Sequence, residues 1–191
     1  ALHNFCHHLR LHFLEPRDAA RLVSEPMEQM EIRWEDREAS LERIIEVTSA
    51  HPNLLQRACA QIVGRLNREG TRRITREQVE EVIADPEFLE EYLDTLWGRS
   101  GELEKILSLA LEEGEELSAQ EMRRRLESDY GVEVSLPAVV EGMESLCLFG
   151  LLEKRGSRYA FAARSFPWMV RQVMDIAEEI ELHKEMMGHG G

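Results

Sequence analysis

The sequence lacks the motifs of the common catalytic and nucleotide-binding machines. None of its 191 residues forms the Gly-rich loop, followed by Lys and Ser or Thr, that cradles a triphosphate. No G-x-S-x-G or H-E-x-x-H motif occurs either. Cysteine is sparse, with three residues far apart and no C-x-x-C pair, which argues against a disulfide framework and fits a reducing compartment. We therefore expect this chain to be no enzyme by itself and to bind no cofactor tightly.

Long hydrophobic runs are also missing. No stretch approaches the roughly 18 uncharged apolar residues needed to cross a bilayer, and no signal peptide is visible. The chain is 43% hydrophobic and 31% charged, which is typical of a globular protein with a packed core. These features predict a cytoplasmic protein without a membrane partner.

Basic residues are fewer than acidic residues in both halves of the chain. The net charge is −14, and residues 1–96 contain 12 basic and 19 acidic residues while residues 97–191 contain 11 and 18, so each half has a charge of −7. Proteins that bind nucleic acid neutralise phosphates with clustered Lys and Arg. Neither half has the overall charge of such a protein.

The first half predicts a helical unit with two short extended segments. Alternating side chains favour extended backbone over residues 9–13 and around residues 30–34. Helical periodicity and capping residues predict four helices: from Pro16 to about Ser24, where Glu25-Pro26 is expected to stop the helix; from Glu35-Asp36 to Thr48; from Pro52 to Gly70; and from Thr75 to about Ile83, where Asp85-Pro86 ends the segment.

The second half predicts three helices, a β-hairpin and a last helix. The three helices are expected from about Leu103 to Gly114, from Ser118 to Gly131 and from Ser135 to Gly150. The hairpin is expected to pair residues 151–154 with residues 158–161, and one helix is expected from Trp168 to about Met187. Three helices followed by a β-hairpin is the element order of a winged helix.

Four strings in the first half resemble the lid of STAND-type AAA+ ATPases, which are signal-transducing switches. They are LHFLEPRDA at residues 11–19, EP at 25–26, TSAHPNLLQ at 48–56 and ITREQV at 74–79. In that family the lid is commonly followed by a winged helix. The resemblance implies a mostly α architecture: an AAA+ helical lid domain at residues 1–96, a winged-helix domain with a small β-hairpin wing at residues 97–167, and a C-terminal helix and tail at residues 168–191.

The resemblance also implies a larger parent protein. The chain would be its C-terminal piece, and the parent an ATPase that binds ATP or ADP with Mg²⁺ in an N-terminal nucleotide-binding domain, which would be the first partner of this piece. A homo-oligomer or an effector protein would be further partners. The phosphate-binding loop and the acidic Mg²⁺ strand would lie before Ala1.

Within the lid, the resemblance implies nucleotide contacts by four residues, His51, Pro52, Asn53 and Arg57. The chemistry agrees, because Pro52 stands at the start of a helix whose free N–H groups favour a phosphate. This sequence has Ala50 where the family usually has Gly, and Ala adopts left-handed backbone at a cost. We therefore expect the turn to differ from that of the family. The alternative interpretation is that His51-Pro52 only begins a helix and that Arg57 is a solvated charge.

A DNA-binding winged helix is the alternative function, as in a replication initiator or a transcription regulator. Its basic residues would be the run Arg123, Arg124 and Arg125 and the hairpin residues Lys154, Arg155 and Arg158. The third helix, which would enter the major groove, instead offers Ala138, Glu141, Glu144 and Ser145 on its outer face. Two carboxylates there would repel phosphates, so we favour a winged helix that contacts protein.

The N-terminal residues His3, Cys6, His7, His8 and His12 form a dense cluster of metal-ligating types. In a helix, His3 with His7 and His8 with His12 would be spaced to share a Zn²⁺ ion. The alternation over residues 9–13 favours extended backbone, and no acid or second cysteine completes the set. We expect scattered histidines and no metal site.

Overall fold

The structure is a computed structural model that describes residues 13–189, and 66% of it is helix and 8% strand. The fold is therefore mostly helical with small sheets, as the sequence predicts. The cluster at His3, Cys6, His7, His8 and His12 lies outside the described residues, and so does most of the extended segment predicted at residues 9–13.

The bounds of the helices and strands are as follows. The described helices are α1 (Pro16–Gln29), α2 (Arg37–Thr48), α3 (Pro52–Glu69), α4 (Arg76–Ile83), α5 (Pro86–Trp97), α6 (Glu102–Leu109), α7 (Ala119–Tyr130), α8 (Leu136–Leu148), α9 (Phe166–Arg171) and α10 (Ile176–His189). The described strands are β1 (Arg33–Trp34), β2 (Arg73–Ile74), β3 (Leu117–Ser118), β4 (Leu152–Arg155) and β5 (Arg158–Phe161).

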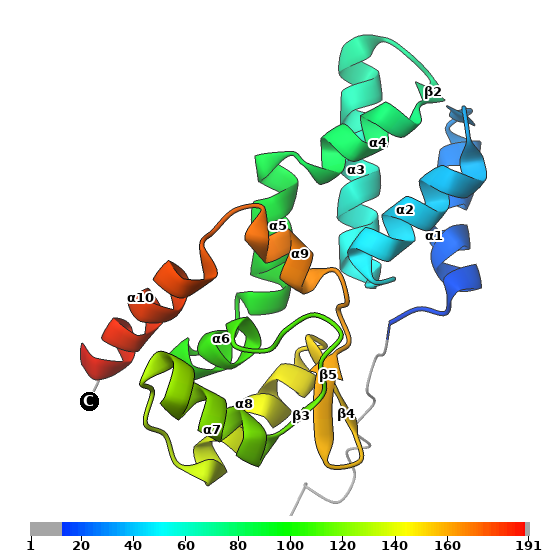
Figure 1. The fold of residues 1–191 in the computed structure, drawn as a ribbon. Helices are drawn as coiled ribbons and strands as arrows, with labels where there is room; N and C mark the ends of the chain where they lie inside the picture. Colours follow the sequence, from blue (N-terminus) through cyan, green and yellow to red (C-terminus); the bar gives the residue numbers. More distant parts are fainter. Residues whose placement is uncertain (1–12, 190–191) are drawn as a thin grey trace, which may run out of the picture.

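The molecule is elongated, with a helical unit at each end (Figure 1). Helices α1 to α4 occupy one end, and α6 to α8 with the three-stranded sheet occupy the other. Helix α5 joins the two ends, and α9 returns to lie beside it before α10 packs along α6. The buried apolar side chains form one continuous cluster that runs through both ends, so the two units share a core.

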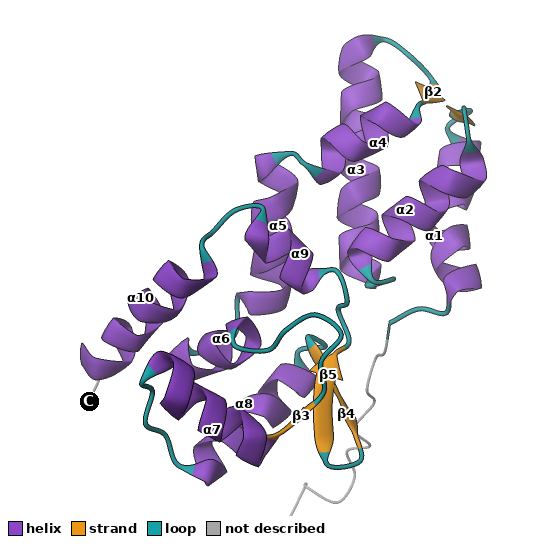
Figure 2. Ribbon diagram, viewed as in Figure 1, coloured by secondary structure: helices purple, strands orange, loops and turns teal. Residues whose placement is uncertain are grey.

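Both sheets are small, as Figure 2 shows in orange. Strands β1 and β2 are parallel, with Trp34 opposite Ile74, and they tie the start of α2 to the start of α4. Strands β3, β5 and β4 form an antiparallel sheet in that order, and β3 was not predicted from the sequence. The predicted order of three helices and a hairpin is present in α6, α7, α8, β4 and β5.

The predicted stop at Glu25-Pro26 is wrong, because α1 continues through Pro26 to Gln29. A proline inside a helix removes one backbone donor and usually breaks the helix. Here the next residue, Met27, is fully buried together with Val23 one turn earlier. Packing of this apolar face outweighs the lost hydrogen bond, which the local sequence could not show.

Helix α5 was missed because Asp85-Pro86 was interpreted only as a stop. The same two residues begin a helix: the Asp85 carboxylate accepts a hydrogen bond from the Glu87 N–H at 2.9 Å, and Pro86 occupies the first helical position. Phe88 and Tyr92 are fully buried along this helix, so it belongs to the core. The predicted domain boundary between residues 96 and 97 falls at its last residue.

The single helix predicted from Trp168 to Met187 is two helices. The chain turns after α9 ends at Arg171. Asp175 then begins α10, because its carboxylate accepts hydrogen bonds from the N–H groups of Ala177 and Glu178 at 2.9 and 3.1 Å. The boundary predicted between residues 167 and 168 therefore falls inside α9. The first helix of this half also ends earlier than predicted, at Leu109, and the left-handed Gly114 lies in the loop that follows it.

Candidate functional site

The turn between α2 and α3 has a left-handed backbone at two successive residues that are not glycine. Ser49 has φ 49° and Ala50 has φ 58°. Ala50 takes the left-handed conformation that glycine favours, although such a backbone is costly for alanine. Three backbone hydrogen bonds hold it there: the Ala50 N–H donates to Ile45 O at 3.0 Å, the His51 N–H donates to Thr48 O at 2.9 Å, and the Leu14 N–H donates to Ala50 O at 3.1 Å. The conformation is costly for alanine, so the surrounding contacts must stabilise it.

His51 directly follows this turn and is half-buried. Its ring lies edge-on to Phe13, with 5.8 Å between the ring centroids. The Nδ1 atom is buried and has no hydrogen-bond partner among the described residues. Burial lowers the pKa of His51 below its usual value, so the ring is neutral at pH 7. A neutral ring with an unpaired nitrogen can accept a hydrogen bond or stack on a flat ligand.

The other predicted contact residues lie on the first two turns of α3 and face α5. Asn53 approaches Thr95 of α5, with 3.5 Å between the side-chain nitrogen and oxygen. Arg57 forms an ion pair with Glu91 of α5 and is therefore not a solvated charge. Gln61, one turn further on, donates to the same carboxylate at 3.3 Å. The structure thus brings the predicted residues together at one end of α3, and α5 already engages two of them.

A polar network centred on Ser165 was missed from the sequence. Its hydroxyl, just before α9, donates to the backbone carbonyl of Val47 at the end of α2. The same oxygen lies 2.8 Å from the Tyr92 hydroxyl on α5 and 3.2 Å from the Ser49 hydroxyl in the left-handed turn. Burial raises the pKa of Tyr92 above its usual value, so this phenol remains a neutral partner. No local pattern reveals a serine whose partners lie more than 70 residues away.

Aromatic side chains continue this connection to both ends of the molecule. Trp168 on α9 lies against the Arg43 guanidinium on α2, 5.3 Å from carbon to ring centroid. Trp97 at the end of α5 packs on Phe166, with 5.3 Å between centroids, and its indole N–H donates to Ser108 of α6 at 3.0 Å. Helices α5 and α9 therefore contact both the α2–α3 turn and the C-terminal unit.

Most of the predicted nucleic-acid residues are engaged by acids of the chain itself. Five of the six form ion pairs: Arg123 with Glu127, Arg125 with Glu115, Lys154 with Glu144, Arg155 with Glu116 and Glu153, and Arg158 with Glu121. Hydrogen bonds to these carboxylates raise the pKa values of Lys154 and Arg155. Glu144, one of the two carboxylates expected to repel phosphates from the third helix, is bound by Lys154 and by the Tyr159 hydroxyl, so its charge is compensated within the chain.

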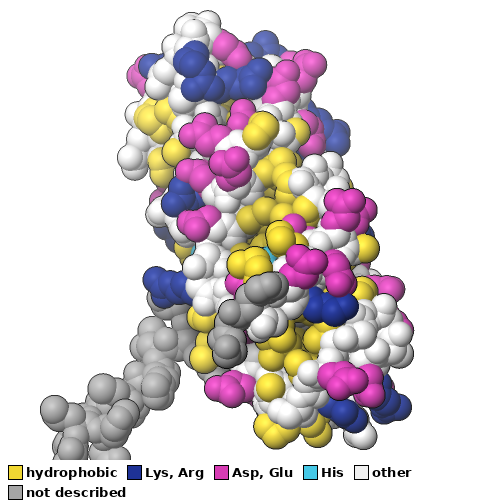
Figure 3. Space-filling view, turned by 90° about the vertical axis from the view of Figure 1, so that its left-hand side faces the viewer, with side chains coloured by type: hydrophobic (Ala, Val, Ile, Leu, Met, Phe, Trp, Pro, Cys, Tyr) yellow, Lys and Arg dark blue, Asp and Glu magenta, His cyan; other side chains and the backbone are white. Residues whose placement is uncertain are grey.

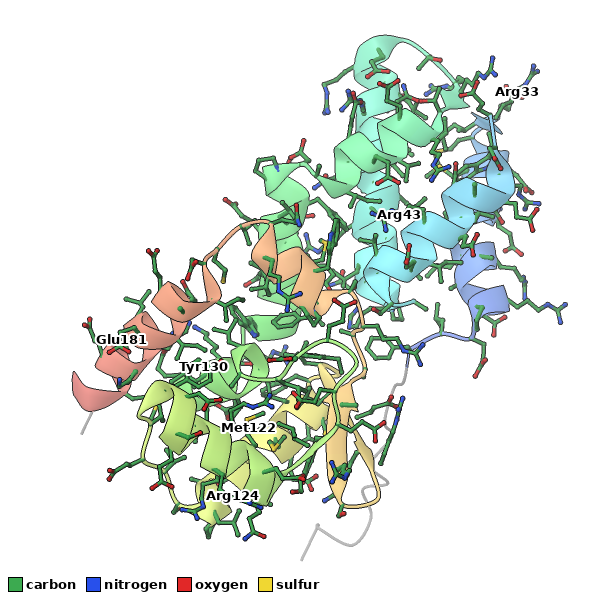
Figure 4. All side chains as sticks on the ribbon, in the orientation of Figure 1. Arg33, Arg43, Met122, Arg124, Tyr130 and Glu181 are labelled. Atoms are coloured by element: carbon green, nitrogen blue, oxygen red, sulfur yellow. The ribbon has the colours of Figure 1, made fainter. Side chains whose placement is uncertain are left out.

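Arg124 is the exception among the six, since it is exposed and forms no ion pair within residues 13–189. Figure 4 shows it on α7, at the end of the molecule opposite to Arg33. In the space-filling view of the face that carries α10, acidic and basic side chains are interspersed and hydrophobic patches lie between them (Figure 3). A single unpaired arginine beside paired ones does not make a basic surface.

Neither metal sites nor membrane spans are found in the part of the chain that the structure describes. No group of three or more His, Cys, Asp and Glu side chains within residues 13–189 is arranged to hold a metal ion. None of the described helices combines the length and the apolar character that crossing a bilayer requires.

Comparison with known proteins adds no assignment. No family model matches the chain, and no curated protein matches it significantly.

Proposed function

We propose that this chain is the regulatory C-terminal part of a STAND-type AAA+ ATPase. Helices α1 to α4 serve as a lid whose α2–α3 turn contacts the nucleotide, and α6 to α8 with β3 to β5 serve as a winged helix that contacts protein. The parent protein supplies the nucleotide-binding domain, the Mg²⁺ ligands and the hydrolysis. The chain itself carries the conformational response.

The observation that carries this proposal is the Ser165 network. A nucleotide-dependent switch requires a physical connection between the site that senses the nucleotide and the surface that responds. Here Ser165 joins Ser49 in the turn, Tyr92 in α5 and the start of α9. A displacement of the turn by a ligand would move α5 and α9, and with them the C-terminal unit that both contact.

Two further features of the turn support a ligand there. The buried Nδ1 of His51 has no described partner, and buried polar atoms are normally hydrogen-bonded. The left-handed Ala50 stores backbone strain, which is concentrated at functional turns in proteins. A ligand that donates a hydrogen bond to His51 Nδ1 would give this nitrogen its missing partner. Its contacts with the turn would offset the cost of the strained backbone at Ala50.

Nucleotide titration of the isotope-labelled chain tests the proposal. Because the chain has no phosphate loop, we expect no ATP hydrolysis and only millimolar affinity for ADP, with NMR shifts at His51, Asn53 and Arg57 that extend to Ser165 and Trp168. In His51→Ala these shifts should weaken, whereas Arg17→Ala, an exposed arginine of α1, should leave them unchanged. Shifts spread over the surface, or none near the turn, would reject the nucleotide role.

The DNA-binding alternative gains no support from the described residues. Five of its six basic side chains are bound by glutamates, and releasing these five would cost the ion pairs that they now form. The acidic balance of each half also opposes approach to a phosphate backbone.

A further inference from the structure

Helix α8 has a fixed orientation in the C-terminal unit. Its inner face buries Val139, Met143 and Leu146 completely. Gly142 on that face packs so closely on α6 that an added Cβ would lie 2.6 Å from the Leu107 side chain. A helix held this tightly cannot rotate its outer side chains into the core, so what they present to solvent is a permanent surface.

The outer face of α8 is partly apolar. Leu136, Val140 and Leu148 are 39%, 37% and 70% exposed, and they lie along the helix from its first residue to its last. At about 1.5 Å per residue they cover a strip of roughly 18 Å. Residues four apart are neighbours on a helix surface, so Leu136 adjoins Val140, and Glu144, which binds Lys154, lies between Val140 and Leu148. We call these three residues the α8 strip.

Acidic groups without a described partner border the α8 strip. Glu141 follows Val140 directly, is exposed, and forms no ion pair within residues 13–189, in contrast to Glu144, which Lys154 binds. Glu133 is likewise exposed and forms no ion pair there, and it lines a shallow cleft of about 370 Å³ between α7 and the loop that precedes α8. Arg123, which pairs with Glu127, also lines that cleft, together with Val132 and Val134. The surface therefore combines apolar contacts with two exposed carboxylates, Glu133 and Glu141, that form no ion pair within the described residues.

We propose that the α8 strip and the adjoining cleft dock a basic amphipathic helix of a partner protein. The apolar face of that helix would cover Val140 and Leu148, and its Lys or Arg residues would pair with Glu141 and Glu133. This inference rests on the proposed function, because it names the partner chemistry of the winged helix as the protein-contacting part. Charge complementarity selects the occupant: nucleic acid would bring more negative charge to these carboxylates, and so would a second copy of this chain with its charge of −14.

The extent of the α8 strip suits a helix of about three turns, which is long enough to carry the i, i+3, i+4 and i+7 anchors of helix-in-groove recognition. Such anchors carry most of the binding energy at a small interface. We therefore expect Leu148, the most exposed of the three, to matter most.

The probe for this test is a synthetic peptide of 18 residues with Leu on one face and Lys on the other, labelled for fluorescence anisotropy at 0.15 M salt. The matched peptide has Glu in place of Lys. The full chain should bind the Lys peptide and not the Glu peptide. Leu148→Ser should weaken binding by about tenfold, which is 1.4 kcal/mol, and Glu141→Gln by about threefold.

Matched controls separate docking from general attraction to an acidic protein. Leu182→Ser and Glu178→Gln change residues of the same kinds on α10, where Leu182 is 48% exposed and Glu178 has no ion pair within residues 13–189. Both should leave the affinity within about twofold. Equal weakening by the α8 and α10 variants, equal binding of the two peptides, or no binding at all would overturn the proposal.

The outcome is distinguishable from a failure of the proposed function. The peptide test uses no nucleotide and no residue of the α2–α3 turn. If the nucleotide titration fails while Leu148→Ser still weakens peptide binding as predicted, α8 is a docking surface without a switch. Self-association of the chain that Leu148→Ser removes would instead identify a second copy as the occupant and reject the basic partner.

Discussion

The α2–α3 turn and the outer face of α8 differ in whether their groups have partners within the chain. In the turn, Ser49 is bonded to Ser165, and the backbone of Ala50 is held by Ile45 and Leu14. On α8, Leu148 and Glu141 have no described partner that covers or neutralises them. The first region is joined to the rest of its own chain, and the second is open to another. This contrast assigns the turn to coupling within the molecule and α8 to contact with a partner.

The largest effect should come from removing the centre of the coupling network. Ser165→Ala leaves the buried Tyr92 hydroxyl and the Val47 carbonyl without their partner, which costs about 1–3 kcal/mol of unfolding free energy. The matched control Ser157→Ala lies in the exposed hairpin turn and should change stability by less than about 0.5 kcal/mol. Urea unfolding measures both, and equal stability of the two variants would show that the network contributes nothing.

The second largest effect should be a gain in stability when the backbone strain in the α2–α3 turn is removed. Ala50→Gly removes the cost of a left-handed alanine and should stabilise the protein by about 1 kcal/mol, because glycine adopts φ 58° freely. The control Ala60→Gly lies at an exposed position in the middle of α3 and should destabilise by about the same amount. Opposite signs in thermal unfolding support the strained turn, and two destabilising changes would contradict it.

A smaller effect concerns the acid stability of the C-terminal unit. Hydrogen bonds from Ser118 lower the pKa of Glu121 to about 2, and Glu121 also pairs with Arg158. A lowered pKa in the folded state contributes stability that is present above pH 4.5 and is lost as the pH falls toward about 2. Glu121→Gln should therefore flatten the fall of stability over this pH range. An unchanged pH profile would show that the capping pair is dispensable.

The smallest effect concerns DNA, which we expect the chain to bind hardly at all. At 0.15 M salt the chain should form no specific complex with duplex DNA, and any binding at low salt should fade steeply as salt rises. Arg124→Ala should reduce that residual binding more than Arg155→Ala does, because Arg155 is already paired with Glu116 and Glu153. A nanomolar, sequence-selective complex in gel shift at 0.15 M salt would reverse our preference for a protein partner.

Local signals in the sequence predicted much of the fold. The cap at Thr75 with Gln78 and the cap at Ser118 with Glu121 begin α4 and α7 as predicted, and both form reciprocal hydrogen bonds. Gly70 ends α3 as predicted. Such signals act within a few residues of each other, so the sequence displays them directly.

The errors arose where distant packing outweighed a local rule. Pro26 does not end α1 because Met27 is buried, and the left-handed Ala50 is held by the nearby Ile45 carbonyl and by the distant Leu14 N–H. Ser165 gave no local signal at all, although it connects three elements. The set His51, Pro52, Asn53 and Arg57 was implied by the family resemblance, and its closeness follows from the short spacing of these residues, whereas the pairing of Arg57 with Glu91 needed the unpredicted helix α5.

Hydrogen exchange at two buried sites tests the central claim, that α5 and α9 make the two ends one cooperative body, most directly. Leu55 in α3 and Met143 in α8 are both fully buried, the first in the N-terminal helical unit and the second in the C-terminal unit. Our account predicts that their opening free energies agree within about 0.5 kcal/mol and fall together in Ser165→Ala, because both amides exchange only by global unfolding. Opening free energies that differ by more than about 2 kcal/mol, with Ser165→Ala lowering only that of Leu55, would contradict it.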